Sequence, residues 1–359
     1  MNFKRISFYL SLFCFPISLL SFINILYASY FDYFLSIDTY FITLIVSLLI
    51  GFGFFYYGKK SLKNINFIEQ LILIICAYIL TSILIAIPFY LGNYQVTFLN
   101  SMFESISGLT GTGFSIFKDI KYLDPTLILW RSSSQWIGGL FFLFFLIIIF
   151  SNKSFNYKMT NLTYSGDNNF KSEGNIKDNL LKIFIIYSLL TIIILSLLNF
   201  SGVRLFNSLN LSMTLISGGG FLPMESLNKI ISTNFQKIIL IFSFIVSLLN
   251  LYLLFNLFNK NTLIKEHKED LYLIILSVIF CTLIYFNDFD GLDIIMSVTS
   301  SLANSGLTLM ATDNNLSLYF LFITIIGGSL ISNSSGIKLT RFYILLKITS
   351  LEIIKLISP

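Results

Sequence analysis

Hydrophobic residues in this chain gather in long runs without charges, and short polar stretches separate the runs. An α-helix needs about 20 apolar residues to cross the hydrocarbon core of a bilayer. Eight runs reach or approach that length: Ile6–Ala28, Thr39–Gly58, Leu71–Leu91, Ser132–Asn152, Ile183–Val203, Ile238–Asn259, Leu271–Asn287 and Asn314–Ile337. The pattern predicts an all-α polytopic membrane protein with eight transmembrane helices that lies in a lipid bilayer.

Basic residues are distributed unequally between the two sides of this predicted bundle. If the N-terminus is cytoplasmic, 17 of the 23 Lys and Arg residues fall on the cytoplasmic side. This agrees with the positive-inside rule and predicts that both termini are cytoplasmic. We therefore interpret the net charge of +5 as a consequence of topology and expect no nucleic-acid partner. The first run is longer than the apolar region of a signal peptide and is expected to be a retained helix.

Three connections on the outer side are too apolar to be plain loops. They are Val96–Phe117, Arg204–Phe221 and Leu292–Met310. Each has an amphipathic first half, which could form a short helix, followed by a cluster of small residues. The chain therefore repeats a unit made of a helix, a pore loop and a second helix.

The small-residue clusters are the candidate binding site for a cation. They consist of Thr110, Gly111, Thr112 and Gly113 in the first loop, Ser217, Gly218, Gly219 and Gly220 in the second, and Ala303, Asn304, Ser305 and Gly306 in the third. Glycine allows successive carbonyl groups to point the same way, and such carbonyls can replace the water shell of a cation. The alternative is that each cluster is a glycine turn or a helix-packing face. Three clusters in register on one side favour a pore.

The last predicted span contains a second irregular segment. Gly327, Gly328, Ser329, Asn333, Ser334, Ser335 and Gly336 together have low helix propensity. We predict a break in the helix, with a softened helix end as the alternative. Lys338 and Arg341 follow the break and are interpreted as cytoplasmic anchors, with a charge that acts inside the broken segment as the less favoured reading.

Two charged residues lie near the first glycine cluster. Arg131 stands within the stretch from Trp130 to Trp136, which is typical of an aromatic belt at the membrane interface. A contact that stabilises the filter is the alternative for Arg131. Glu104 lies in the predicted first pore helix, where we expect it to pair with a cation or to cap the backbone.

The sequence offers little for catalysis or for a bound cofactor. Cys14, Cys76 and Cys281 lie in apolar spans without the spacing of a metal site, and the single histidine, His267, lies in a charged loop. The eight charge-free runs contain no pair of acidic or histidine residues such as an intramembrane enzyme needs. We expect no enzyme and no covalently bound cofactor.

Four motifs resemble the membrane subunit of the Trk/Ktr/HKT potassium transporter superfamily, and are most similar to the TrkH type. The segments FESISGLTGTGFSIF and LWRSSSQWIGG resemble its first pore loop and the start of the helix that follows. RLFNSLNLSMTLISGGGF resembles the second pore loop, and IGGSLISNSSGIKLTR resembles the broken helix of the third repeat. The resemblance covers roughly Asn66 to Arg341.

The resemblance implies potassium uptake across a bacterial inner (plasma) membrane. Proteins of this family carry one key filter glycine per repeat, which here would be Gly113, Gly220 and Gly306, with K⁺ bound only at the filter. The segment from Gly327 to Gly336 would be an intramembrane gate loop beneath the filter. The family also forms homodimers and works with a cytosolic nucleotide-binding subunit of the TrkA or KtrA kind. Symport with H⁺ or Na⁺ and channel-like flux both remain open.

The resemblance also divides the chain into parts. Residues 1–63 would be an N-terminal helix pair, 64–152 the first repeat, 153–182 a cytoplasmic loop, 183–259 the second repeat, 260–341 the third repeat and 342–359 a cytoplasmic tail. Family members have four repeats, and a fourth glycine cluster does not occur before Pro359. An incomplete, non-conducting assembly or regulatory subunit is therefore the alternative function. The third loop also departs from the family, which usually has threonines there.

Overall fold

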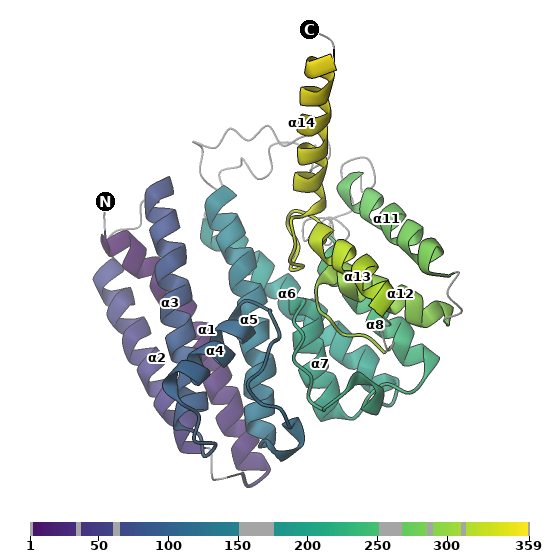
Figure 1. The fold of residues 1–359 in the computed structure, drawn as a ribbon. Helices are drawn as coiled ribbons and strands as arrows, with labels where there is room; N and C mark the ends of the chain where they lie inside the picture. Colours follow the sequence, from purple (N-terminus) through teal and green to yellow (C-terminus); the bar gives the residue numbers. More distant parts are fainter. Residues whose placement is uncertain are drawn as a thin grey trace.

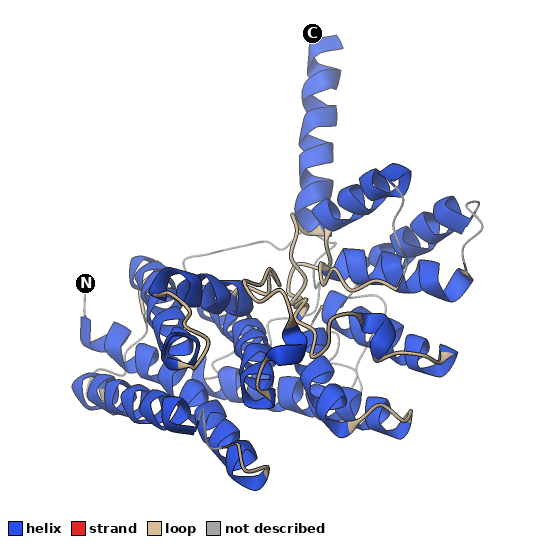
Figure 2. Ribbon diagram, turned by 60° about the horizontal axis from the view of Figure 1, so that its bottom comes forward, coloured by secondary structure: helices blue, strands red, loops and turns tan. Residues whose placement is uncertain are grey.

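The computed structural model describes residues 3–33, 37–59, 65–150, 176–250, 268–285, 290–309 and 314–357. Every regular element in these ranges is helical, as Figure 2 shows. The predicted loop 153–182 falls largely outside the described residues, as do His267 and the end of the predicted span Ile238–Asn259.

The helices follow the repeated order expected from the sequence. Helices α1 (Phe3–Tyr30) and α2 (Ile37–Gly58) form an antiparallel pair beside the rest of the molecule (Figure 1). The first unit consists of α3 (Phe67–Leu91), α4 (Phe98–Leu109) and α5 (Pro125–Phe150). The second consists of α6 (Ile176–Phe200), α7 (Leu205–Ser217) and α8 (Asn234–Leu248). The third consists of α11 (Lys268–Tyr285), α12 (Gly291–Ala303), α13 (Asn314–Ile326) and α14 (Leu339–Ile357).

Five of the described helices are long and apolar enough to cross a membrane. They are α1, α2, α3 and most of α5 and α6. The prediction of an all-α polytopic membrane protein is confirmed. The predicted span Asn314–Ile337 is not one helix, because α13 ends at Ile326 and an irregular segment follows before α14 begins.

The second helix of each unit is too short to be a membrane span. Helices α4, α7 and α12 have 12 or 13 residues, which at 1.5 Å per residue is about 18–20 Å. Helix α4 is capped by Thr97, whose hydroxyl accepts a hydrogen bond from the Asn100 N–H at 3.4 Å. Helices α7 and α12 end at Gly218 and Asn304, both in the left-handed conformation that stops a helix. Each short helix therefore ends where a glycine cluster starts.

Helix α5 is the centre of the packing. It contacts α1, α3, α4, α6 and α7, and most of its residues are buried. A β-carbon on Gly138 would clash with the backbone of Leu109 at the end of α4. One on Gly139 would lie 3.0 Å from the β-carbon of Ser217 at the end of α7. The two glycines thus let α5 approach the ends of both pore helices.

The prediction of an interfacial aromatic belt is wrong. Trp130 and Trp136 are buried, at 1% and 8% exposure. The Trp130 indole donates to the Ile85 carbonyl at 3.0 Å, and the Trp136 indole donates to the Thr191 hydroxyl at 3.0 Å. These partners let both indoles pack inside the protein, where an unpaired N–H would be costly.

The segment after residue 341 is helical. Helix α14 extends away from the other helices in Figure 1. Leu346, Ile348 and Ile354 on this helix are about half exposed. The division of the chain into domains stays a prediction.

Candidate functional site

Three glycine loops, each following a short helix, meet at one place. Loop 1 comprises residues 110–114, loop 2 residues 217–221 and loop 3 residues 303–307. A β-carbon placed on Gly113 would lie 3.0 Å from the Cα of Gly220, and one on Gly220 would lie 2.8 Å from the Ser305 carbonyl oxygen. One on Gly218 would lie 3.2 Å from the Ala303 oxygen. The structure therefore brings the three predicted clusters together through their backbones.

The same backbone hydrogen bond fixes all three loops. In each, an N–H donates to the carbonyl five residues earlier, inside the preceding short helix. The pairs are Thr112 to Ser107 at 3.0 Å, Gly219 to Thr214 at 2.9 Å and Ser305 to Ser300 at 3.1 Å. The residue after each donor is Gly113, Gly220 or Gly306. These glycines therefore occupy equivalent positions.

Backbone conformation explains the glycines of the loops only in part. The first turn position is left-handed in all three, with φ of +69° at Gly111, +67° at Gly218 and +59° at Asn304. Asparagine tolerates this conformation better than most side chains, so loop 3 keeps the turn without glycine. Two positions later, Gly113 has φ of +80° and Gly306 has +68°. Gly220 is not left-handed, and its lack of a side chain is explained by its closeness to Ser305.

A buried ion pair supports loop 1 through the residues that directly follow it. The Arg131 Nε donates to Glu104 Oε1 at 2.8 Å, and both side chains are almost fully buried. Glu104 Oε2 also accepts from the Ile116 N–H at 2.9 Å, while Arg131 and Glu104 both bond the Ser115 hydroxyl. The expectation that Glu104 pairs with a cation and caps the backbone agrees with this geometry. Arg131 is not an interfacial anchor: its guanidinium is held inside the protein by a carboxylate 27 residues away.

Helix α5 also supports loop 2. The Arg131 guanidinium lies 4.3 Å from the centre of the Phe221 ring, which directly follows Gly220. The Phe221 N–H donates to Gln135 Oε1 at 3.2 Å, and a β-carbon on Gly219 would clash with the Gln135 amide. Arg131 and Gln135 are one helical turn apart, so one face of α5 contacts both loops. Gln135 was not among the site residues predicted from the sequence, because its neighbours Ser134 and Trp136 do not indicate a contact with a loop.

The segment between α13 and α14, residues 327–338, forms a closed loop with a narrow neck. We call it the α13–α14 loop. Its ends are joined by hydrogen bonds from Ile337 N–H to the Ile325 carbonyl and from Leu339 N–H to the Gly328 carbonyl, at 2.9 and 3.1 Å. A β-carbon on Gly336 would lie 2.9 Å from the Cα of Gly327. The predicted break is therefore an ordered loop and not a softened helix end.

Lys338 lies inside this loop. It is 5% exposed, and its ammonium donates to the Ser332 carbonyl and hydroxyl at 3.1 Å each and to the carbonyl and hydroxyl of Ser334. The reading of Lys338 as a cytoplasmic anchor is wrong, and the charge inside the loop, the less favoured reading, agrees with the structure. Arg341 is exposed, as an anchor would be.

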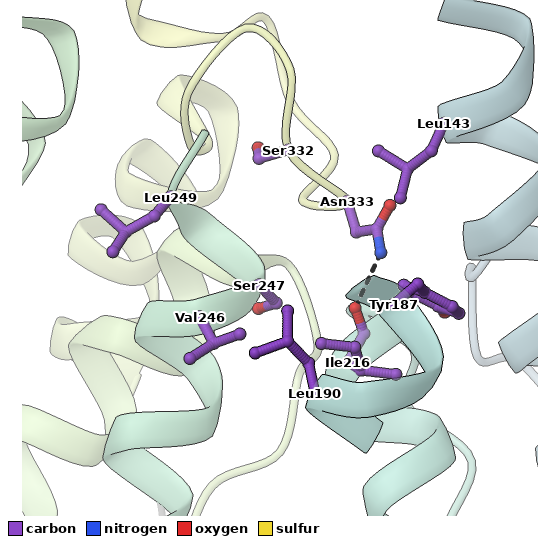
Figure 3. A pocket seen from close by; sticks show the side chains of 9 residues that line it. All are labelled: Leu143, Tyr187, Leu190, Ile216, Val246, Ser247, Leu249, Ser332 and Asn333. Atoms are coloured by element: carbon purple, nitrogen blue, oxygen red, sulfur yellow. Dashed lines mark hydrogen bonds between the residues drawn. The ribbon is translucent and has the colours of Figure 1, made fainter. Parts of the chain in front are cut away.

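The tip of the α13–α14 loop lies against loop 2. Figure 3 shows the Asn333 amide pointing to the Ile216 carbonyl, to which it donates at 2.8 Å. A β-carbon on Gly218 would lie 3.3 Å from the Asn333 carbonyl oxygen. Beside the tip is a small cavity of about 10 Å³, lined by Ser332 and Asn333 and by residues of α5, α6, α7 and the end of α8. The tip is thus fixed to the end of α7 but is not packed on every side.

The chemistry of this arrangement is that of backbone oxygens and hydroxyls. Among the described residues no group of three or more His, Cys, Asp or Glu side chains could hold a metal ion. The Thr110 and Thr112 hydroxyls hydrogen-bond each other at 2.6 Å at the exposed side of loop 1. Neutral oxygens of this kind suit a monovalent cation that is bound briefly and released.

Comparison with known proteins shows the fold and a similarity to potassium uptake proteins. No family model matches the chain. It is 28% identical over 355 residues to the potassium uptake protein TrkG of Escherichia coli, which covers 90% of this chain and 70% of TrkG. It superposes on the crystal structure of the potassium transporter TrkH of Vibrio parahaemolyticus with a TM-score of 0.84, over all of this chain and 77% of that one, at 19% identity. The chain is therefore similar to Trk potassium uptake proteins over most of its length, and it shares the fold of TrkH.

The Trk resemblance extends to an archaeal relative. An uncharacterized cation transporter of Methanocaldococcus jannaschii is 27% identical over 326 residues, or 86% of this chain. The present chain spans 65% of that relative's length and 70% of TrkG.

Proposed function

We propose that this chain is a Trk-type transporter that takes up potassium across the membrane, with the three glycine loops as its selectivity filter. The observation that carries the proposal is the shared hydrogen bond that sets Gly113, Gly220 and Gly306 at equivalent positions of converging loops. The names of its relatives, which are transporters and not enzymes, support it. K⁺ is the transported ion, and the proposed uptake needs no bound cofactor.

In the proposed mechanism, backbone carbonyls of residues 110–113, 217–220 and 303–306 replace the water around K⁺. Such a site works only if the carbonyls are held in place when the ion leaves. The Glu104–Arg131 pair holds loop 1, and Gln135 holds loop 2. Because the guanidinium is paired with a carboxylate, its charge does not act alone on the passing cation.

The α13–α14 loop is the proposed gate. Its tip lies at the end of α7, next to the backbone of loop 2, so it stands where an ion leaving the filter would pass. The buried Lys338 ammonium holds the tip closed through Ser332 and Ser334.

The setting proposed for the protein follows its family. It lies in a bacterial inner membrane with both termini in the cytoplasm, and it assembles as a homodimer with a cytosolic nucleotide-binding subunit of the TrkA or KtrA kind. The names of the relatives, which refer to a Trk system, support a transporter of several components.

Rubidium uptake by cells that lack their own potassium transporters tests the function. The chain is expressed as it stands and, in parallel, as a fusion that carries the part of TrkG beyond the region of similarity. We expect uptake above that of empty vector, with growth at low potassium. If both proteins reach the membrane and neither supports uptake, the proposal is wrong.

A further inference from the structure

A buried carboxylate outside the filter contacts the α13–α14 loop. Glu269, the second residue of α11, is 2% exposed. Its Oε1 accepts hydrogen bonds from the Leu330 N–H at 3.0 Å, from the Thr340 N–H at 3.3 Å and from the Thr340 hydroxyl. One oxygen atom thus joins α11 to the loop and to the first turn of α14.

These donors lie on opposite sides of the loop's neck. Leu330 belongs to the limb that leaves α13, whereas Thr340 follows the neck and begins α14. A carboxylate at the N-terminus of a helix is favoured by the free N–H groups and the helix dipole there. Glu269 caps α14 from another helix and, in doing so, ties the outgoing limb to it.

Glu269 also supplies a negative charge near the base of the loop. Its carboxylate interacts electrostatically with the Lys338 ammonium. A buried ammonium needs a counter-charge or enough hydrogen-bond acceptors to be stable. Lys338 binds Ser332 and Ser334, on either side of the tip residue Asn333. Glu269 therefore acts on the tip through Lys338 and on the limb directly.

We propose that Glu269 is a positioning residue that latches the α13–α14 loop in its closed position. The inference rests on the proposed role of this loop as a gate. It predicts that removing the carboxylate opens the loop and raises ion flux, although Glu269 touches neither the glycine loops nor the tip.

The test uses a cysteine inside the loop as a reporter that does not depend on flux. Ser329 is fully buried, and within the described residues its hydroxyl has no hydrogen-bond partner, so Ser329→Cys removes no contact. The three native cysteines are replaced by serine. Membranes carrying the protein are treated with a small cationic methanethiosulfonate reagent, and the rate of modification of the new cysteine is measured.

We expect Glu269→Ala to raise the modification rate about tenfold, the size expected from losing hydrogen bonds to a charged acceptor. Glu269→Gln keeps an oxygen for Thr340 but loses the charge, so its rate should be intermediate. The matched control is Glu69→Ala. Glu69 is a buried carboxylate in the first turn of α3, where it bonds Asn66 and Arg5. The control should leave the rate unchanged.

A modification rate in Glu269→Ala within about twofold of the parent would overturn the latch. If that variant does not accumulate, Thr340→Val, which removes only the hydroxyl donor, replaces it, and an unchanged rate there also overturns the inference. Rubidium uptake is measured on the same membranes. Faster modification without uptake by any variant would contradict the proposed function but not the latch, whereas normal uptake with unchanged modification would contradict the latch alone.

Discussion

Adding a β-carbon at Gly113 distinguishes a glycine of the filter from a glycine that serves only in packing. The φ of +80° at Gly113 costs a side chain about 1–2 kcal/mol, and the added atom would lie 3.0 Å from the Gly220 Cα. Gly113→Ser should therefore displace loop 1 and lower the preference for K⁺ over Na⁺ by about tenfold, the factor that ~1.4 kcal/mol represents. Gly220→Ser should act in the same direction, through its contact with the Ser305 carbonyl. Paired uptake of rubidium and sodium measures the effect.

The control for Gly113 is Gly53→Ser in α2, where an added β-carbon meets no described atom within 4 Å. This variant should keep the parent preference. If Gly113→Ser also keeps both preference and rate, residues 110–113 are not the filter and serve only in packing.

The Glu104–Arg131 pair makes a prediction about stability. Removing one member of a buried pair leaves the other charge unpaired, so Arg131→Ala should lower the free energy of unfolding by about 3–5 kcal/mol. Glu104→Leu together with Arg131→Met should recover part of this loss, since neither charge remains. Thermal unfolding in detergent, monitored by size-exclusion chromatography, measures the stability of both variants.

An exposed pair provides the comparison. Lys355 and Glu352 are bonded at 2.9 Å in α14, but their side chains are 71% and 62% exposed. Lys355→Ala should therefore lower the free energy of unfolding by only about 0–1 kcal/mol. Equal losses for Arg131→Ala and Lys355→Ala would show that the Glu104–Arg131 pair does not support loop 1.

How far single residues could be predicted depends on how local their cause is. The glycine clusters could be found because a turn leaves its mark on four adjacent residues. Arg131 could not be placed, since a tryptophan neighbour is typical of an interface and the partner Glu104 is distant in sequence. Glu269 was missed for a similar reason: beside Lys268 and Asp270 it looks like part of a solvated loop.

At the scale of elements, the α13–α14 loop makes the clearest prediction. It has an ordered neck, a tip on α7 and a cavity beside the tip. Deleting residues 332–335 removes the tip and its bonds to Lys338 while leaving the neck, so ion flux should rise several-fold. Rubidium uptake normalised to the amount of protein in the membrane checks this.

A milder variant separates the tip from the rest of the loop. Asn333→Ala breaks only the hydrogen bond to the Ile216 carbonyl and should raise flux less than the deletion does. If both variants accumulate normally and neither changes the flux, the loop is a passive break in the helix.

Helix lengths were harder to predict than helix positions. The apolar run from 314 to 337 satisfies the length of a span, yet the chain leaves the helix after Ile326 because its serines find partners in Leu248 and Lys338. A hydropathy profile averages over neighbouring residues, so it cannot detect partners that are distant in the sequence. Periodicity did anticipate the short helices α4, α7 and α12, whose amphipathic pattern stands apart from the uniformly apolar spans.

For the whole molecule, the distribution of charge predicts which side each connection faces. Arg131 and Lys338 prove to be buried, but the excess of basic residues on the cytoplasmic side remains without them. Gln95→Cys, before α4, should react with an impermeant maleimide from outside intact cells. Lys59→Cys, after α2, should react only after the cells are opened. Both positions are exposed.

Reaction of the cysteine at position 59 from outside would contradict the predicted topology. A cysteine placed at Phe141, buried in α5, serves as a negative control in both conditions.

The bond that closes each glycine loop onto its own helix has a consequence for how such a protein can change over generations. Thr112, Gly219 and Ser305 each find their acceptor inside their own unit, so the hydrogen bond that closes each turn does not involve a neighbouring unit. A substitution in one copy of a duplicated unit then leaves the turns of the other copies intact. Asn304, standing where the other units have Gly111 and Gly218, is a change of this kind. One unit can therefore change the residues of its turn while the others keep theirs, and loops that began alike can become unequal.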